Sequence, residues 1–282
     1  MSSERALTYD LDDLVYLMRR LRDPDTGCPW DIKQTYKTVL PSTIEEAYEV
    51  ADAIEREDLD ALKEELGDYL FQAIFYCQMA TEEERFDIYS VIDALVKKLV
   101  RRHPHVFPEG ALRQGAEQKS LPSSDQKNRV DQNAVNKRWE EIKQQERATK
   151  GLEGVFDDVP KALPALLHAQ KTQKRAAKQK FDWTSLPPVY EKLTEEMVEL
   201  QEACNSGDQG RIEDELGDVL FSCVNISRHI KVDAETALRR ATNKFQTRFL
   251  AMQALAEKEY RDRAFEELSI DEMEALWQRV KY

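Results

Sequence analysis

The sequence predicts an all-α protein of two homologous helical-bundle modules, and three observations support this fold class. Glycine supplies only 9 of the 282 residues, so turns are few and the elements between them are long. Apolar residues recur with the 3.6-residue period of a helix, and no segment requires a β-sheet. A stretch of the first half also recurs in the second half, which indicates a duplicated unit.

The duplication sets the expected domain organisation. Residues 44–76 align with residues 194–226 without a gap, and 11 of the 33 positions are identical. We therefore expect one module at residues 1–150 and a second at residues 151–282. Residues 110–135 are rich in Gln, Ser, Asp and Lys, and they are expected to form a mobile connection.

Each module is predicted to contain a pair of amphipathic helices. In the first module, apolar stripes predict helices over 44–54 and 59–73, with a capped start at Pro41-Ser42-Thr43. In the second module, stripes over 193–204 and 212–223 flank a turn at Asn205-Ser206-Gly207-Asp208.

Composition narrows the function classes. The formal net charge of −13 argues against binding to nucleic acid polymers, which need a basic surface. No apolar run approaches the roughly 20 residues of a membrane span. The four cysteines lack a C-x-x-C pair and the chain starts without a signal-like segment, so we expect a cytoplasmic protein. Neither glycine-rich phosphate-binding motif is present, so any phosphate must be held by side chains and metal.

Acidic pairs on the apolar stripes are the strongest chemical signal. Glu196 and Glu215 lie along the stripes of two neighbouring helices, and Glu199 and Asp218 follow one turn later. A buried carboxylate must protonate, pair with a cation or bind metal, so these four groups are expected to converge. Oxygen-only ligands favour Mg²⁺, with Mn²⁺ as a substitute, and therefore a phosphate substrate.

The simpler interpretation of one acidic pair is a solvated helix face, but two copies on apolar stripes argue against it. A di-iron bundle would need Glu-x-x-His pairs, which the four histidines do not provide. Two basic pairs lie at i, i+4 and could neutralise a triphosphate or form ordinary solvated faces: Lys98 with Arg102, and Lys244 with Arg248. Two Trp-x-x-x-Lys pairs, Trp139 with Lys143 and Trp277 with Lys281, could stack on a ligand or anchor the core.

These motifs resemble the MazG family of tandem-domain nucleoside triphosphate pyrophosphohydrolases. The resemblance covers essentially the whole chain and includes the flanking sequences GCPWD (27–31), EELGD (64–68) and RRHPHVF (101–107). It implies an all-α, usually dimeric enzyme that uses Mg²⁺ to convert a nucleoside triphosphate and water to a monophosphate and pyrophosphate. Broad, housecleaning nucleotide specificity is implied as well.

The resemblance also assigns residues. The metal ligands would be Glu46, Glu49, Glu65 and Asp68 in the first module and Glu196, Glu199, Glu215 and Asp218 in the second. The triphosphate would be held by Lys192, Arg211, Lys244, Arg248, Trp277 and Lys281, with Lys98 and Arg102 in the first module. Ser42 and Ala61 stand where the second module has Lys192 and Arg211, so we expect the second module to be the better catalyst.

The expected reaction is in-line attack of water on the α-phosphorus, with Glu195 or Asp214 as general base. Two alternatives stay open. One is a non-catalytic helical regulatory or interaction protein whose acidic clusters bind metal or a basic partner. The other is a related pyrophosphohydrolase specialised for one nucleotide, such as dUTP or phosphoribosyl-ATP.

Overall fold

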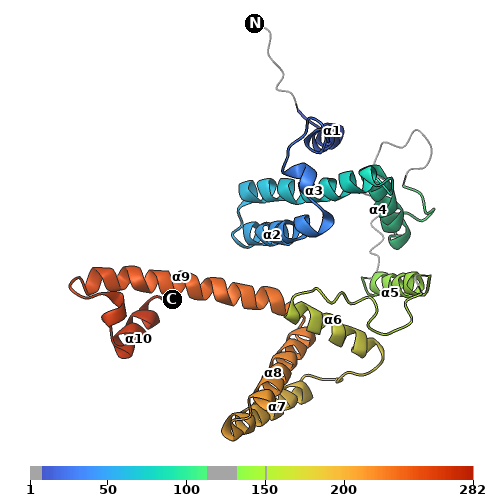
Figure 1. Ribbon diagram of the computed structural model, residues 1–282. Coiled ribbons are helices and arrows are strands. Elements are labelled where there is room, and N and C mark those ends of the chain that lie inside the picture. Colours follow the sequence, from blue (N-terminus) through green and yellow to red (C-terminus); the bar gives the residue numbers. More distant parts are fainter. Residues whose placement is uncertain (1–7, 113–131, 150, 282) are drawn as a thin grey trace, which may run out of the picture. The chain divides into compact units, whose positions relative to one another are not determined.

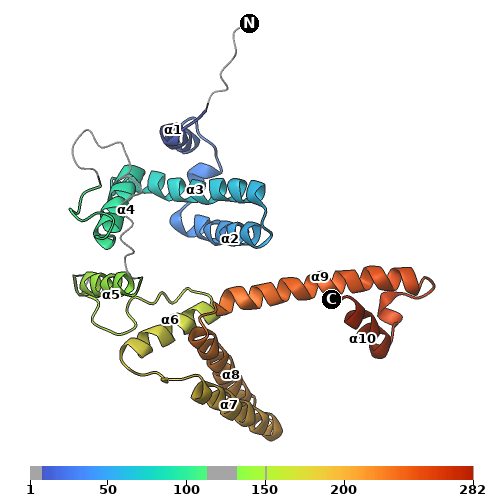
Figure 2. The ribbon, with the colours of Figure 1, turned by 180° about the vertical axis from the view of Figure 1, so that it is seen from behind.

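The computed structural model describes residues 8–112, 132–149 and 151–281, and every regular element within those ranges is a helix. The chain divides into two compact units, Met1–Lys143 and Gln144–Tyr282, which are described separately (Figures 1 and 2). The predicted all-α fold class is confirmed.

Unit 1 is built around an antiparallel helical hairpin. Its two helices, α2 and α3, lie side by side, while α1 packs on α3 and α4 lies at the C-terminal end of α3 (Figure 1). The elements in chain order are α1 (Leu11–Leu21), η1 (Asp31–Lys33), α2 (Tyr36–Glu55), α3 (Leu59–Glu82), α4 (Ile88–Arg102) and the first part of α5 (Gln132–Thr149).

Unit 2 repeats the hairpin and adds a long helix. Helices α7 and α8 form the hairpin, α6 packs across α8, and α9 leaves the end of α8 in a different direction from the hairpin (Figure 2). The C-terminal helix α10 folds back onto α9. The elements in chain order are α6 (Ala165–Lys178), α7 (Pro187–Ser206), α8 (Gln209–His229), α9 (Ala234–Glu259), η2 (Phe265–Glu267) and α10 (Ile270–Arg279).

The turn inside each hairpin has the same construction. Asp58 and Asp208, which are 150 positions apart, each cap the second helix: Asp58 accepts a hydrogen bond from the backbone N–H of Ala61, and Asp208 accepts one from that of Gly210. The preceding residues, Glu57 and Gly207, both adopt the left-handed conformation, with φ values of 57° and 72°. The predicted turn at 205–208 is confirmed at Gly207 and Asp208, whereas Asn205 and Ser206 are the last two residues of α7.

The predicted start of the first hairpin is wrong. Helix α2 begins at Tyr36 rather than near Pro41-Ser42-Thr43, and Pro41 lies inside it. Thr35 caps this helix because its side chain accepts a hydrogen bond from the backbone N–H of Thr38, while Thr38 Oγ1 accepts one from the backbone of Thr35. The reciprocal cap nucleates the helix five residues before Pro41, and only one turn of the helix precedes the proline.

The connection predicted at 110–135 is longer than the structure supports at its C-terminal end. Residues 132–135 belong to α5, and residues 113–131 lie outside the described ranges. No helix among the described residues has both the length and the apolar character needed to span a membrane.

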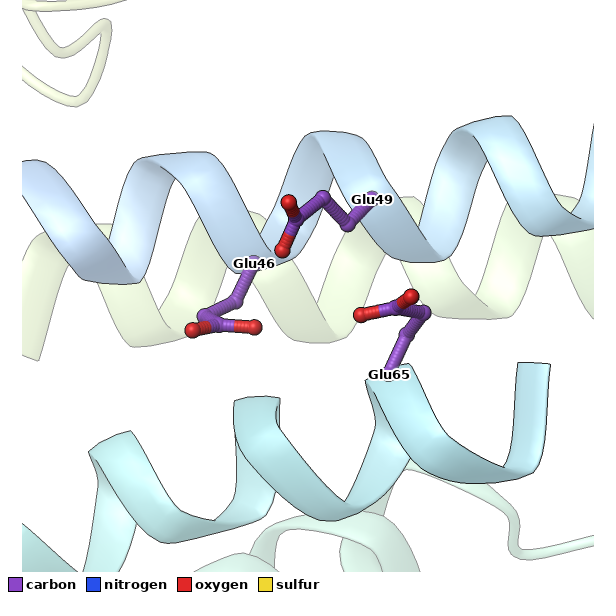
Figure 3. A group of neighbouring side chains, drawn as sticks. All are labelled: Glu46, Glu49 and Glu65. Atoms are coloured by element: carbon purple, nitrogen blue, oxygen red, sulfur yellow. The ribbon is translucent and has the colours of Figure 1, made fainter. Parts of the chain in front are cut away.

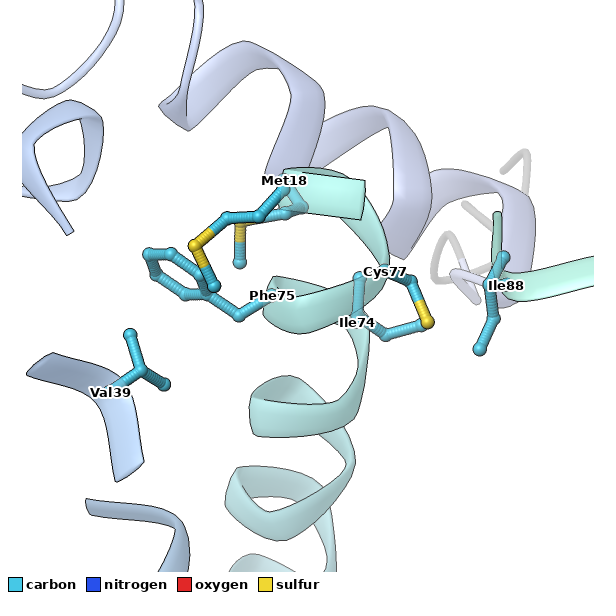
Figure 4. Packing of buried hydrophobic residues seen from close by; sticks show 7 residues of the cluster. Met18, Val39, Ile74, Phe75, Cys77 and Ile88 are labelled. Atoms are coloured by element: carbon cyan, nitrogen blue, oxygen red, sulfur yellow. The ribbon is translucent and has the colours of Figure 1, made fainter. Parts of the chain in front are cut away.

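Two apolar clusters position the hairpins and the end of the chain. In unit 1, buried residues of α1, α2, α3 and α4 meet around the C-terminal part of α3: Met18, Val39, Ile74, Phe75, Cys77, Met79 and Ile88 (Figure 4). In unit 2, Met252 and Ala256 of α9 pack with Leu268 and Leu276. Both clusters lie away from the turn-proximal ends of the hairpins, which carry the acidic side chains.

Candidate active site

The first hairpin brings three carboxylates together. Glu46 from α2 and Glu65 from α3 point into the space between the two helices, and the Glu49 side chain lies along α2 toward Glu46 (Figure 3). One oxygen of each lies within 4.8 Å of the others. Burial, followed by the nearby carboxylates Asp68 and Glu49, raises the pKa of Glu46 above its ordinary value. These groups therefore favour a shared proton or a cation.

The second hairpin repeats the cluster. Glu196 on α7 and Glu215 and Asp218 on α8 present oxygens within 4.8 Å of one another. Glu196 is the most enclosed of them, with 5% of its surface exposed, whereas Glu215 is half-buried and Asp218 is exposed. The expected inward orientation of Glu196 is thus observed. Three clustered carboxylates, one of them buried, suit a hard divalent cation such as Mg²⁺.

The fourth acidic residue of each set lies beside its cluster. A hydrogen bond with Glu196 is the main cause that raises the pKa of Glu199, and burial adds to it. In unit 1, Asp68 lies close enough to raise the pKa of both Glu46 and Glu65. The eight predicted ligands thus fall into two neighbouring groups of four, and in each group three members present oxygens within 4.8 Å of one another.

Lys192 on α7 contacts the carboxylate cluster of the second hairpin. The Lys192 ammonium nitrogen lies 2.8 Å from Glu196 Oε1 and 2.7 Å from Glu195 Oε1. These two hydrogen bonds, that of Glu195 first, raise the pKa of Lys192, which stays charged. The i, i+4 spacing from Lys192 to Glu196 was available in the sequence and is the signal that could have predicted this ion pair.

The remaining predicted groups of the second hairpin lie near its turn. Arg211 lies in the first turn of α8 and is exposed, as is Asp214 one turn later. Glu195, the other predicted base, points to the Lys192 ammonium. Both predicted bases thus lie next to residues of the carboxylate cluster, Glu196 and Glu215.

The other predicted phosphate-binding residues of unit 2 gather on α9 and α10. Arg248 donates a hydrogen bond to the backbone carbonyl of Lys281 at 3.0 Å. Trp277 lies 5.3 Å from Phe245 between ring centroids and packs against the apolar cluster of α9 and α10. Helix α9, which carries Lys244 and Arg248, leaves the end of α8 in a different direction from the α7–α8 hairpin (Figure 1).

The equivalent residues of unit 1 lie on α4 and α5. Lys98 is half-buried on α4, and Arg102 ends that helix. The backbone carbonyl of Arg102 accepts a hydrogen bond of 2.5 Å from the indole of Trp139, and the Lys143 ammonium lies 5.6 Å from the centroid of the same indole. Helix α4, which carries Lys98 and Arg102, contacts α3 at its C-terminal end, opposite the α2–α3 turn (Figure 1).

A group of ion pairs that the sequence did not predict connects the segment before α7 to the end of α8. Asp182, just before α7, accepts hydrogen bonds from Arg228 and His229 at the end of α8. These contacts, the Arg228 hydrogen bond foremost, hold the pKa of Asp182 below its ordinary value. Gln173 of α6 also donates to the carbonyl of Phe221 on α8, at 2.8 Å. Partners so distant along the chain left no periodic signal.

Unit 1 also contains an apolar cavity of about 300 Å³, which none of the clustered carboxylates lines. It is lined by α4 and the turn that follows it, including Val96, Leu99 and Phe107, and none of its lining residues is acidic. Its chemistry does not suit a phosphate or a divalent cation, so the acidic hairpins are the better candidate site.

Comparisons with known proteins agree with this geometry. The family model of the MazG nucleotide pyrophosphohydrolase domain matches twice, at residues 34–107 and 188–249. These two ranges contain the two acidic hairpins, so the tandem repeat is confirmed.

Named relatives extend the match to nearly the whole chain. The nucleoside triphosphate pyrophosphohydrolase of Escherichia coli K12 is 45% identical over 273 residues, which cover 96% of this chain and 97% of the relative. The nucleoside triphosphate pyrophosphohydrolase/pyrophosphatase MazG of Thermotoga maritima is 41% identical and covers 96% of this chain and 95% of its own length. YabN of Bacillus subtilis is 37% identical over 282 residues, 53% of its length. This chain therefore belongs to the MazG family of nucleotide pyrophosphohydrolases.

Proposed function

We propose that this protein uses Mg²⁺, or Mn²⁺ in its place, to hydrolyse nucleoside triphosphates to a monophosphate and pyrophosphate. The observation that carries the proposal is the convergence of carboxylates in both hairpins, where the oxygens of three side chains lie within 4.8 Å of one another. In the second hairpin, Glu196, Glu199, Glu215 and Asp218 would hold the cation. In the first, Glu46, Glu49, Glu65 and Asp68 would do so.

We assign cation binding and proton transfer to different residues of the site. A divalent cation at the cluster would offset the negative charge of the triphosphate and make water more acidic. Glu195 or Asp214 then accepts the proton of the water that attacks the α-phosphorus, and pyrophosphate leaves in line. Both bases are adjacent to ligands without belonging to the triad of contacting oxygens.

The cations around the two clusters support an active second module. Lys192 lies within 2.8 Å of Glu196, whereas Ser42 occupies the equivalent place in the first hairpin. Arg211 is replaced by Ala61 in the same way. A triphosphate carries about four negative charges, so the module with more cations binds it better and is the better catalyst. Lys98 and Arg102 remain as the phosphate-binding candidates of the first module.

Broad nucleotide specificity fits the residues in the proposed site. The clustered side chains are carboxylates and cations, which recognise phosphate and metal rather than the donors and acceptors of a particular base. A panel of canonical and modified nucleoside triphosphates tests this: we expect turnover of several bases, and turnover of dUTP alone would instead support the specialised alternative.

We further propose that modules 1–150 and 151–282 work in a homodimer. Large apolar side chains remain exposed on the second hairpin, among them Met197 at 59%, Leu216 at 46% and Leu220 at 50%. A second copy would cover this face, and its α9 could bring Lys244 and Arg248, followed by Trp277 and Lys281, toward the carboxylate cluster. Sedimentation of the full chain, with Leu220→Glu as a weakening variant, tests the dimer.

Product identity in labelled water tests the reaction. We expect the full chain with Mg²⁺ to release a monophosphate and pyrophosphate in equal amounts, and ¹⁸O from water to enter only the monophosphate. Label in the pyrophosphate would contradict attack at the α-phosphorus. Absence of turnover with every triphosphate would support the non-catalytic alternative.

Two variants on α8 test whether that reaction depends on the carboxylate cluster of the second hairpin. Glu215→Gln removes a clustered carboxylate, whereas Glu213→Gln removes an exposed one from the same helix. We expect Glu215→Gln to abolish most turnover and Glu213→Gln to leave it unchanged. Equal behaviour of the two variants would count against the assigned site.

A further inference from the structure

The acidic cluster of unit 2 already contains a cation of the chain itself. The Lys192 ammonium lies 2.8 Å from Glu196 Oε1, and Glu196 is only 5% exposed. The same ammonium also pairs with Glu195 at 2.7 Å. A positive charge this close to a buried carboxylate lowers the cost of ionising the cluster, so Lys192 acts on the same oxygen that a divalent cation would need.

The first hairpin has no such charge at the equivalent position. Ser42 lies four residues before Glu46, as Lys192 lies four residues before Glu196. The two clusters therefore differ in their built-in charge balance.

We propose that Lys192 is an internal counter-ion of the second cluster, which competes with a divalent cation for Glu196 and, once displaced, moves to the triphosphate. The inference rests on the proposed function, because it assumes that the cluster binds the cation. Lys192 suits the exchange: its side chain is 35% exposed, and an ammonium on a flexible stem can change partners by rotation. Lys192 would thus be a positioning residue that couples cation binding to substrate binding.

Opposite effects on two ligands distinguish this role from a merely structural one. Removal of Lys192 should strengthen binding of Mn²⁺ alone, because the competing ammonium is gone. The same change should weaken binding of inorganic triphosphate in the presence of saturating Mn²⁺, because the displaced ammonium is no longer there to contact it. A general disturbance of the hairpin would weaken both.

The experiment uses the full chain with the first cluster silenced by Glu49→Gln and Glu65→Gln, and titrates it calorimetrically. In this background we expect Lys192→Met to bind Mn²⁺ about tenfold more tightly and triphosphate about tenfold more weakly. Lys192→Arg keeps the charge and should restore both values toward those of the parent. Lys171→Met, which removes an exposed lysine from α6, is the matched control and should change neither. Far-ultraviolet circular dichroism checks that each variant keeps its helices.

A reciprocal variant tests the same idea in the other hairpin. With the second cluster silenced by Glu199→Gln and Glu215→Gln, Ser42→Lys should weaken Mn²⁺ binding to the first cluster by about threefold. Equal Mn²⁺ affinity with and without Lys192 would overturn the counter-ion role while leaving the cation site intact. Failure of both clusters to bind Mn²⁺ in any variant would overturn the proposed function as well.

Discussion

The two acidic hairpins share one backbone plan but differ in the cations that surround it. Both place acidic residues 150 positions apart on antiparallel helices, with an aspartate cap at the same point of the turn. Only the second has a lysine against its buried glutamate and an arginine in the first turn of its second helix. Both modules thus keep the carboxylates, whereas the second module alone has these two cationic side chains, which suit a phosphate ligand.

The largest expected effect comes from Lys244 and Arg248, the residues of α9 that we propose to bind phosphate. We expect Lys244→Ala and Arg248→Ala each to raise the KM for a nucleoside triphosphate about tenfold, because each removes a charge-assisted contact with phosphate. Lys258→Ala, in the last turn of the same helix, is the control and should leave KM unchanged. Steady-state kinetics measure the three variants. An unchanged KM in Lys244→Ala and Arg248→Ala would remove α9 from the site.

The ion pairs of Asp182 give a prediction of intermediate size, which concerns the free energy of unfolding. Asp182→Asn should lower the free energy of unfolding by about 2 kcal/mol at neutral pH, because Arg228 loses a charged partner. The pKa of Asp182 is lowered by folding, so its contribution is present above the ordinary value of 3.8 and is lost as the pH falls through the folded pKa. Urea unfolding at several pH values should therefore show a difference from the unsubstituted protein that vanishes in acid. A constant difference would contradict the ionic origin.

The smallest expected effects on stability come from substitutions at the left-handed residue in the turn of each hairpin. Glu57 and Gly207 occupy equivalent left-handed positions, where a side chain is strained. We expect Glu57→Gly to stabilise the protein by about 0.5 kcal/mol and Gly207→Ala to destabilise it by about 1 kcal/mol. Thermal unfolding measures both. A loss of stability in Glu57→Gly would show that the Glu57 side chain makes a contact worth more than the backbone strain.

The hairpins were predictable because their information is local and periodic. Apolar stripes located α3, α7 and α8, and acidic residues on those stripes indicated which carboxylates face inward. The start of α2 was missed because Pro41 looks like a helix start, whereas the Thr35–Thr38 cap that forms the actual start is made of residues common in loops.

Long-range arrangement was not predictable in the same way. The direction in which α9 leaves the hairpin depends on contacts of α6, α8 and α10, which are distant in sequence. The Lys192–Glu196 spacing was visible, but spacing alone does not decide between a solvated lysine and one that pairs with a buried carboxylate. The Asp182–Arg228 pair spans 46 positions and left no motif.

Separate substitution of the equivalent glutamates Glu46 and Glu196 tests the asymmetry between the two modules most directly. Glu46→Gln and Glu196→Gln should be prepared in the full chain and assayed for hydrolysis of a nucleoside triphosphate with Mg²⁺. We expect Glu196→Gln to lose about 100-fold or more of kcat/KM and Glu46→Gln to stay within about twofold of the unsubstituted protein. Equal losses in the two variants would contradict the account.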